Sequence, residues 1–278
     1  MDSLTDAPTL TQRYRTIWIS DIHLGYKHCK AEFLLDFLKS TESDTLFLVG
    51  DVIDTLSLKR HFYWPGSHQQ VIDLILDKQK HGTRIIYIPG NHDELDGLLV
   101  GSELLRIESQ SEFIYTTADN RVFLVCHGDE FDSVVCGGRL NRWIGRIGYN
   151  LLLHVSDSYN WIRKCLGKPY WSLTTYVKNR VKRARNTIDK FESTAAAEAK
   201  RRSTNGISLD GIICGHIHQP EIRYLDSVLY CNDGDWVENC TAMAEDQNGS
   251  LNILHWADLK QPIKSEHPSI HTSEPLAR

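Results

Sequence analysis

The stretch Arg84-Ile85-Ile86-Tyr87-Ile88-Pro89-Gly90-Asn91-His92-Asp93 joins a short apolar run to a polar turn. Its first half is rich in β-branched residues, which predicts a buried strand. Gly90 allows the chain to turn sharply after the strand. The turn then presents an amide oxygen, an imidazole and a carboxylate together. The stretch therefore predicts a strand whose carboxyl end carries functional groups.

Four other apolar runs end in clusters of the same kind. These clusters are Asp21-Ile22-His23, Gly50-Asp51-Val52-Ile53-Asp54, His127-Gly128-Asp129 and Gly215-His216-Ile217-His218. Functional groups concentrate in the crevice at the carboxyl ends of strands in α/β sheets. We therefore expect one site assembled from five loops.

The segments between these clusters predict the fold class. Apolar residues recur at helical spacing in residues 31–39 and 69–80, between apparent strands at 16–20, 45–49 and 84–88. This alternation favours an α/β fold with parallel strand pairing throughout. The second half is richer in β-structure, with a hairpin-like pair of strands at 112–117 and 121–126. Further strands are expected at 210–214, 221–224, 227–231 and 250–256.

Length and composition indicate an ordinary globular protein. The chain has 278 residues, 41% of them hydrophobic, and a net charge of −5, with no apolar run long enough to span a bilayer. Its first residues lack the pattern of a signal peptide. Seven Cys without a Cys-x-x-Cys pair argue against a disulfide framework or a zinc ribbon. We expect a cytoplasmic protein with a disordered segment 1–14, one domain 15–260 and a loose tail 261–278.

The charge is unevenly distributed along the chain. Residues 139–202 contain 15 Lys/Arg and 4 Asp/Glu, whereas the remainder contains 16 and 32. Apolar residues at helical spacing predict at least two amphipathic helices in this region. Because both ends of the region 135–205 join site-bearing strands, we expect a helical cap inserted over the site. A structural hairpin that only packs against the body remains the alternative.

The residue types at the strand ends favour metal binding. Carboxylate, imidazole and amide groups without thiolate suit Mn²⁺, Fe²⁺, Zn²⁺ or Co²⁺. Seven such groups exceed what one ion needs and suit two ions about 3.5–4 Å apart, which a carboxylate such as Asp51 can bridge. The predicted ligands are Asp21, His23, Asp51, Asn91, His127, His216 and His218. The isolated histidines are interpreted as core or surface residues: His28, His61, His68, His81 and His154.

In order, spacing and residue type, the five clusters resemble the signature of the calcineurin-like metallophosphoesterases. The resemblance runs from residue 21 to 218. It implies a four-layer α-β-β-α sandwich of two mixed sheets, with helices outside, and two divalent ions, most readily Mn²⁺. It also implies a hydroxide held between the ions that attacks phosphorus in line. One implied ligand set is Asp21, His23, Asp51 and His218, and the other is Asp51, Asn91, His127 and His216.

The resemblance also implies roles for the residues beside the ligands. His92 would protonate the leaving oxygen or stabilise charge on the phosphate. Asp54 would orient His92, although a turn cap is an equally open interpretation. Asp93 is expected to be structural, and the segment around Asn232 and Trp236 to be a tight turn with a core Trp.

Within the family, the basic insert resembles that of the UDP-2,3-diacylglucosamine hydrolases of lipid A synthesis. Those enzymes release UMP and a lipid monophosphate at the inner membrane surface, so peripheral membrane contact is implied. Each candidate substrate contact could also belong to an ordinary solvated or surface aromatic face. These candidates are Trp64, Arg142, Arg146, Lys178, Arg180, Lys182, Arg183 and Arg185.

One departure leaves the substrate open. That enzyme group usually has Arg where this chain has His92. A phosphomonoesterase or phosphodiesterase acting on soluble nucleotides or phosphoproteins is therefore the main alternative. A nuclease is disfavoured because the basic residues are confined to the insert, and no nucleic-acid partner is expected. A non-catalytic scaffold is disfavoured because all seven ligands are present.

Overall fold

The computed structural model describes residues 11–93, 107–132, 139–203 and 208–259 of the chain. Within helices, the side chains of residues 139–148, 150 and 183 lie outside this description. The expected C-terminal tail and nearly all of the expected disordered N-terminal segment also lie outside it.

The first sheet has six strands in the order β11-β10-β1-β2-β3-β4. β1 (Gln12–Ile19), β2 (Thr41–Val49), β3 (Arg84–Ile88) and β4 (Glu108–Ser109) are parallel. β10 (Thr241–Glu245) pairs antiparallel with both β1 and β11 (Leu251–His255). Parallel pairing throughout was therefore a wrong expectation, since β10, a strand with little sequence signal, inserts beside β1.

The beginning of β1 corrects another expectation. Gln12, Arg13 and Tyr14 pair in register with Thr41, Glu42 and Ser43 of β2. The strand therefore starts inside the segment 1–14, which was expected to be disordered. The pairing along β2 orders these polar residues, although their side chains gave no sign of a strand.

The second sheet has five strands in the order β5-β6-β7-β9-β8. Its central strands β6 (Val122–Cys126), β7 (Gly211–Cys214) and β9 (Val228–Asn232) are parallel. At the two edges, β5 (Glu112–Thr116) and β8 (Glu221–Leu225) are antiparallel to their neighbours. Both sheets are thus mixed.

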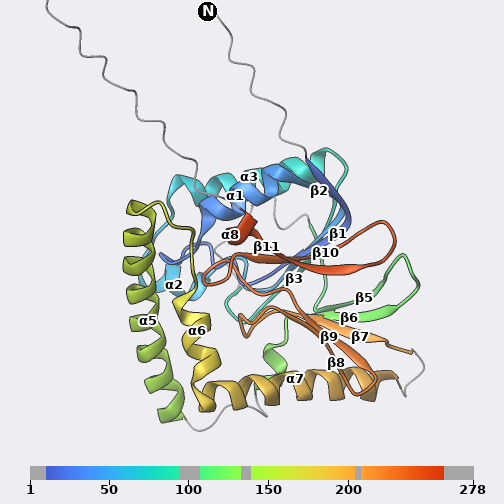
Figure 1. The fold of residues 1–278 in the computed structure, drawn as a ribbon. Coiled ribbons are helices and arrows are strands. Elements are labelled where there is room, and N and C mark those ends of the chain that lie inside the picture. The colour runs from blue at the N-terminus through green and yellow to red at the C-terminus, as the bar shows by residue number, and fades with distance from the viewer. Residues whose placement is uncertain (1–10, 94–106, 133–138, 204–207, 260–278) are drawn as a thin grey trace, which may run out of the picture.

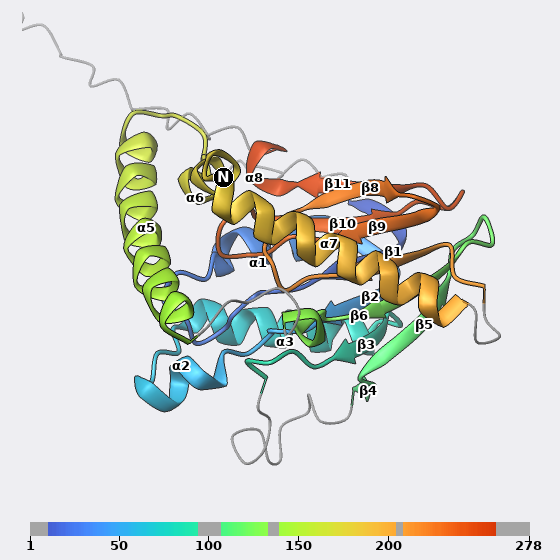
Figure 2. The same ribbon diagram turned by 90° about the horizontal axis from the view of Figure 1, so that it is seen from below.

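Helices cover the outer faces of the two stacked sheets (Figure 1). α1 (Ala31–Ser40) and α3 (Gly66–Lys80) pack on the first sheet, beside the short α8 (Trp256–Leu259). α7 (Lys182–Ser203) runs across the second sheet, as Figure 2 shows from below. One apolar cluster fills each interface between layers, and Trp18, Phe47 and Phe123 meet between the sheets. The four-layer α-β-β-α sandwich is confirmed.

The helical insert is divided between the body and the site. Phe191, Ala195 and Ala199 of α7 are fully buried and pack in one cluster with Leu124 and Ile212 of the second sheet. α7 is therefore the fourth layer of the sandwich, and the expectation that the whole insert forms a cap is wrong. The sequence pattern of an apolar helix face is the same whether that face packs on a sheet or covers a site.

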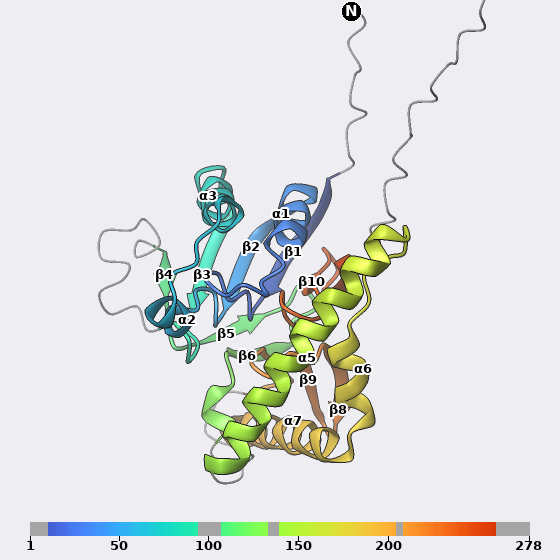
Figure 3. The ribbon, with the colours of Figure 1, turned by 90° about the vertical axis from the view of Figure 1, so that its left-hand side faces the viewer.

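Only α5 (Arg139–Cys165) and α6 (Leu173–Arg180) stand at one edge of the layers (Figure 3). We call this α5–α6 pair the cap. Two short helices, α2 (Thr55–Arg60) and η2 (Asp129–Phe131), follow strand ends on the same side. Across the described ranges, no helix combines the length and apolarity that crossing a bilayer requires.

Candidate dinuclear metal centre

The loops that follow β1 and β2 run side by side past the ends of their strands. The Asp21 amide donates to the Gly50 carbonyl at 3.0 Å, and the His23 amide donates to the Asp51 carbonyl at 2.8 Å. A bridge between Leu24 and Ile53 continues this pairing. The parallel register of the two strands therefore carries over into the loops and brings Asp21, His23 and Asp51 together.

Five of the predicted ligands adopt left-handed backbone conformations. The φ angles are 48° at Asp21, 54° at His23, 53° at Asp51, 69° at His216 and 51° at His218. Such conformations are uncommon for residues with a Cβ and cluster at functional sites. Each one turns the chain abruptly at a strand end, which brings consecutive functional groups to the same place.

Two glycines make room for the ligands. A Cβ on Gly50, whose φ is +82°, would lie 2.2 Å from His127 Nδ1. A Cβ on Gly90 would lie 2.3 Å from Asp51 Oδ1 and 2.8 Å from His127 Nε2. All three distances are far below van der Waals contact, so the packing of Asp51 against His127 depends on glycine at both positions.

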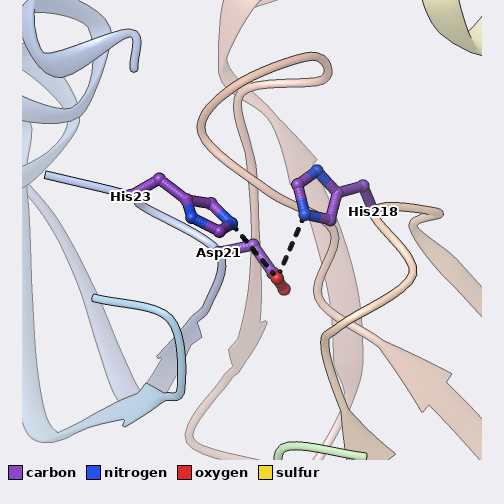
Figure 4. A group of neighbouring side chains, drawn as sticks. All are labelled: Asp21, His23 and His218. Carbon is purple, nitrogen blue, oxygen red and sulfur yellow. Dashed lines mark ion pairs between the residues drawn. The ribbon is translucent and has the colours of Figure 1, made fainter. Parts of the chain in front are cut away.

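The first ligand cluster contains Asp21, His23 and His218, which come from two different sheets (Figure 4). Asp21 Oδ1 lies 3.2 Å from His218 Nε2 and 3.8 Å from His23 Nε2. The other carboxylate oxygen, Oδ2, accepts from the Ser20 hydroxyl and from the His216 amide, each at 2.7 Å. Asp21 is thus fixed through one oxygen and presents the other to the two imidazoles.

The second cluster contains Asp51, His127 and His216, with ligand atoms within 4.8 Å of one another. Asp51 Oδ1 lies 3.5 Å from His127 Nε2 in this cluster. Asp51 Oδ2 lies 3.6 Å from His23 Nε2 in the first cluster. The two oxygens of one carboxylate therefore face two separate groups of ligands.

Partners on Nδ1 orient three of the imidazoles. His127 Nδ1 contacts the Val49 carbonyl at 2.9 Å, and His23 Nδ1 lies 3.3 Å from Asp54 Oδ2. His218 Nδ1 lies 3.4 Å from Glu238 Oε1. Each arrangement leaves Nε2 facing the ligand cluster, which is how metal-binding histidines are usually held. His216 differs, because its Nε2 lies 3.0 Å from Asp132 Oδ1.

Asp54 fits both interpretations offered from the sequence. Its Oδ1 accepts from the Ser57 amide at 2.7 Å and so caps α2. The same oxygen lies 3.1 Å from His92 Nδ1. Burial works to raise the pKa of Asp54, but His23 and His92 together hold it well below its ordinary value. An ionised Asp54 therefore keeps the His92 ring in one orientation.

Asp93, by contrast, is structural. Its buried carboxylate accepts from the Ile53 amide at 2.8 Å and from the Gly90 amide at 3.0 Å. These bonds tie the turn after β3 to the loop after β2. Asp93 therefore fixes the position of Asn91 and His92 without facing the ligands.

The two clusters fit divalent cations. Asp21 Oδ1 and His127 Nε2 are buried polar atoms without a hydrogen-bond partner among the described residues. Burial opposes charge on the imidazoles, yet the carboxylates raise the pKa of His127 to about 10 and that of His218 to about 9. Burial likewise opposes ionisation of Asp51, but His127 and His23 bring its pKa to about 2. The carboxylates thus attract positive charge to this site, which protons supply in the metal-free protein and divalent ions would supply in their place.

A cleft of about 480 Å³ opens beside the two clusters. Predicted ligands, Asn91 among them, line it with His92 and with apolar Leu56, Ile217 and Val237. Among the described cap side chains, Tyr149 of α5 and Lys178 of α6 also line the cleft. Of the predicted cap contacts whose side chains the structure describes, only Lys178 therefore lies at the site.

The other predicted contacts with described side chains lie away from the cleft. Trp64 packs against the His68 ring and donates to Gln69 at 3.2 Å, because α2 carries the chain away from the cleft before Trp64 is reached. Arg185 pairs with Asp189 along α7 at 3.3 Å, while Arg180 lies over the Tyr176 ring and Lys182 is exposed. The Arg142, Arg146 and Arg183 side chains are outside the described residues.

Several residues at the site were not predicted. Arg60 and Tyr149 line the cleft, Asp132 contacts His216, and Glu238 contacts His218. Glu238 follows the segment Asn232-Asp233-Gly234-Asp235-Trp236, which was correctly interpreted as a turn around a buried Trp. A second acidic group close behind that turn was the available signal for Glu238.

Comparison with known proteins identifies a family. The calcineurin-like phosphoesterase family profile matches residues 14–220, which include all five clusters. The search of curated proteins found no match. The assignment to a family therefore rests on the profile.

Solved structures give distant similarities. The hypothetical protein PH1004 from Pyrococcus horikoshii is 10% identical with a TM-score of 0.45, over 88% of each chain. Yfce, a phosphoesterase from E. coli, is 15% identical with a TM-score of 0.41, over 86% of this chain and 98% of that one. Vps29 from Entamoeba histolytica is 11% identical with a TM-score of 0.41, over 86% and 96%.

Proposed function

This chain belongs to the calcineurin-like phosphoesterase family, and we propose that this metal-dependent phosphoesterase uses two ions to hydrolyse a diphosphate bond in a nucleotide-linked lipid. A substrate of the class of UDP-2,3-diacylglucosamine, giving UMP and a lipid monophosphate, is the specific form of the proposal. Mn²⁺ is the proposed native metal, with Fe²⁺, Zn²⁺ and Co²⁺ as alternatives of similar ligand preference.

The observation that carries the two-metal proposal is the position of Asp51. One of its oxygens lies 3.6 Å from His23 Nε2 and the other lies 3.5 Å from His127 Nε2. A carboxylate in this position would hold both ions. Asp21, His23 and His218 would complete one site, and Asn91, His127 and His216 the other. Bound divalent ions supply a nucleophile from water at neutral pH and neutralise charge on the phosphoryl oxygens.

His92 is the proposed proton donor to the leaving oxygen. Asp54 contacts its Nδ1 at 3.1 Å, which leaves Nε2 for the substrate in the cleft that His92 lines. A carboxylate close to Nδ1 holds the ring so that Nε2 faces the cleft. His92 would therefore deliver a proton without leaving its place beside the ligands.

The cleft lining supports a substrate with anionic and apolar parts. Lys178 and Arg60 supply cations beside the ligands, and Leu56, Ile217 and Val237 supply apolar contacts. Lys178 already donates to Glu238 at 2.7 Å, but an ammonium group has three donors and can contact a phosphate as well. The cations suit the diphosphate, and the apolar residues suit the beginning of an acyl chain.

The cap surface supports peripheral contact with the inner membrane, from which such a substrate would come. Residues 139–180 contain eight Lys/Arg and a single acidic residue, Asp157. Leu151 and Trp161 of α5, and Leu166 directly after it, are each more than 60% exposed. Exposed apolar residues together with cations suit the surface of an anionic bilayer. We accordingly propose a cytoplasmic location, on that membrane face, and no nucleic-acid partner.

The test is turnover of UDP-2,3-diacylglucosamine with Mn²⁺, measured as UMP release, beside turnover of bis-p-nitrophenyl phosphate in the same buffer. Fast UMP release that is absent in Asp51→Ala supports the full proposal. Hydrolysis of the small ester alone would retain the two-metal chemistry and refute the lipid substrate. That result would favour the soluble phosphodiester or phosphomonoester alternative, to which His92 in place of Arg already points.

A further inference from the structure

Glu238 connects the cap to the candidate metal centre. Its buried Oε1 accepts from the Tyr149 hydroxyl of α5 at 2.6 Å and from the Lys178 ammonium of α6 at 2.7 Å. The same oxygen lies 3.4 Å from His218 Nδ1. One carboxylate oxygen therefore meets both cap helices and an imidazole of the first ligand cluster.

The turn that carries Glu238 is itself fixed on both sides. The Asp235 carboxylate accepts from the Val237 amide at 2.7 Å and from the Asn239 side chain at 2.5 Å. The Asn239 amide group also donates to the His218 carbonyl at 3.1 Å. The same turn thus holds the main chain of His218 and places a carboxylate oxygen beside its ring.

Further hydrogen bonds connect the cap to this turn. The Thr175 hydroxyl of α6 donates to the Asn239 side chain at 2.6 Å, and the Tyr170 hydroxyl donates to the Glu238 carbonyl at 2.8 Å. Lys178 also lies over the Tyr149 ring, 5.3 Å from its centroid. The cap therefore contacts the residues that orient His218 at several independent points.

We propose that Glu238 is a positioning residue through which the cap sets the orientation of His218, and hence the affinity of the ion bound by Asp21, His23 and His218. This inference rests on the proposed role of His218 as a ligand. A metal-bound imidazole donates its other N–H to a fixed acceptor, and loss of that acceptor typically weakens metal binding about 10–100-fold. Here Tyr149 and Lys178 fix the acceptor, so the cap contributes to metal binding without supplying a ligand.

The coupling also acts in the opposite direction. Because Lys178 lines the cleft, an anion bound there contacts the same ammonium that fixes Glu238. Binding free energies at coupled sites are reciprocal. Occupation of the cleft by inorganic phosphate should therefore change the affinity of the ion beside His218 more than that of the other ion.

The experiment measures Mn²⁺ binding to the full chain by calorimetric titration, with metal content checked by elemental analysis. Glu238→Gln should weaken one of the two ions about 10–100-fold and leave the other unchanged. Tyr149→Phe and Lys178→Met should weaken the same ion by a smaller factor. Tyr176→Phe and Lys164→Met are matched controls on the exposed face of the cap and should bind both ions as the unmodified protein does.

Unfolding of the metal-free variants separates positioning from stability. If Glu238→Gln lowers the unfolding temperature but both ions bind with unchanged affinity, Glu238 is only structural and the inference is wrong. If that variant does not fold, Tyr149→Phe decides, since it removes one hydroxyl and keeps the ring. Failure of the unmodified protein to bind two ions or to hydrolyse a phosphoester would instead refute the proposed function.

Discussion

The ligand-bearing loops and the cap face the same cleft, but the chain builds them differently. Asp21, Asp51 and His127 are buried, and hydrogen bonds or glycine contacts fix their positions. The cap instead leaves large apolar side chains in solvent, with Trp161 68% exposed. The loops have the fixed geometry that the proposed chemistry requires, whereas the cap carries the exposed apolar side chains on which the proposed membrane contact rests.

The largest effect should come from the loops, at Asp51. Asp51→Ala removes a ligand from both proposed ions, so metal binding and hydrolysis should disappear together. Elemental analysis and turnover of bis-p-nitrophenyl phosphate measure the two properties. Asp73→Ala, on the exposed side of α3, is the control. Retention of two ions per chain in Asp51→Ala would contradict the bridging position.

Substitution of His92 should separate catalysis from metal binding within the loops. His92→Ala should reduce turnover about 10²–10⁴-fold, the usual contribution of a general acid, with two ions still bound. Loss of an ion together with activity would mean that His92 is a ligand or supports one. His81→Ala, at the exposed end of α3, should change neither property.

The third prediction compares how much α7 and the cap contribute to the stability of the fold. Phe191→Ala on α7 should lower the free energy of unfolding by about 3–5 kcal/mol, because it leaves a cavity in the outer core. Trp161→Ala on α5 should change it by no more than about 0.5 kcal/mol. Chemical denaturation of the metal-free proteins measures both values. Equal effects at the two positions would show that α7 and the cap are not distinct.

The remaining predictions concern the dependence on pH. Carboxylates overcome the effect of burial and raise the pKa of His127 to about 10 and of His218 to about 9, so both are protonated in the metal-free protein at neutral pH. An ion must displace these protons, so Mn²⁺ affinity should rise with pH between 6 and 8, about tenfold per pH unit for each proton released. Calorimetry in buffers of different ionisation enthalpy counts the protons. A pH-independent affinity would contradict this charge state.

Metal-free stability should respond to pH with the opposite sign. A raised folded-state pKa stabilises the fold fully below the unfolded value near 6.5, and this contribution disappears as pH rises through about 9–10. Metal-free protein should therefore lose stability as pH rises from about 6.5 to 10. Denaturation at several pH values in a chelator tests this trend.

Side-chain chemistry and spacing indicated directly which residues would come together at the strand ends. Asp21, His23 and His218 meet as expected, although almost two hundred residues separate the first from the last. The left-handed backbone at five ligand positions was not predictable, since Asp and His tolerate it without requiring it. Helical periodicity located α7 but could not tell which surface its apolar face would cover.

Glu238 escaped prediction for a related reason. Its importance depends on Tyr149 and Lys178, which reach it from helices some sixty to ninety residues away in the chain. No local sequence pattern predicts a contact between residues so far apart in the chain. The acidic turn around Asp235 was visible in the sequence, but its partners were not.

The position of α7 determines which deletions in the inserted region the fold can tolerate. Deletion of the whole basic region, 135–205, would remove α7 from the outer face of the second sheet. Leu124 and Ile212 would then be exposed to water. A shorter excision must stop before Lys182, where α7 begins. The boundaries for transferring or exchanging the cap are therefore the end of η2 and Val181. They are not the ends of the basic region, where the charge changes.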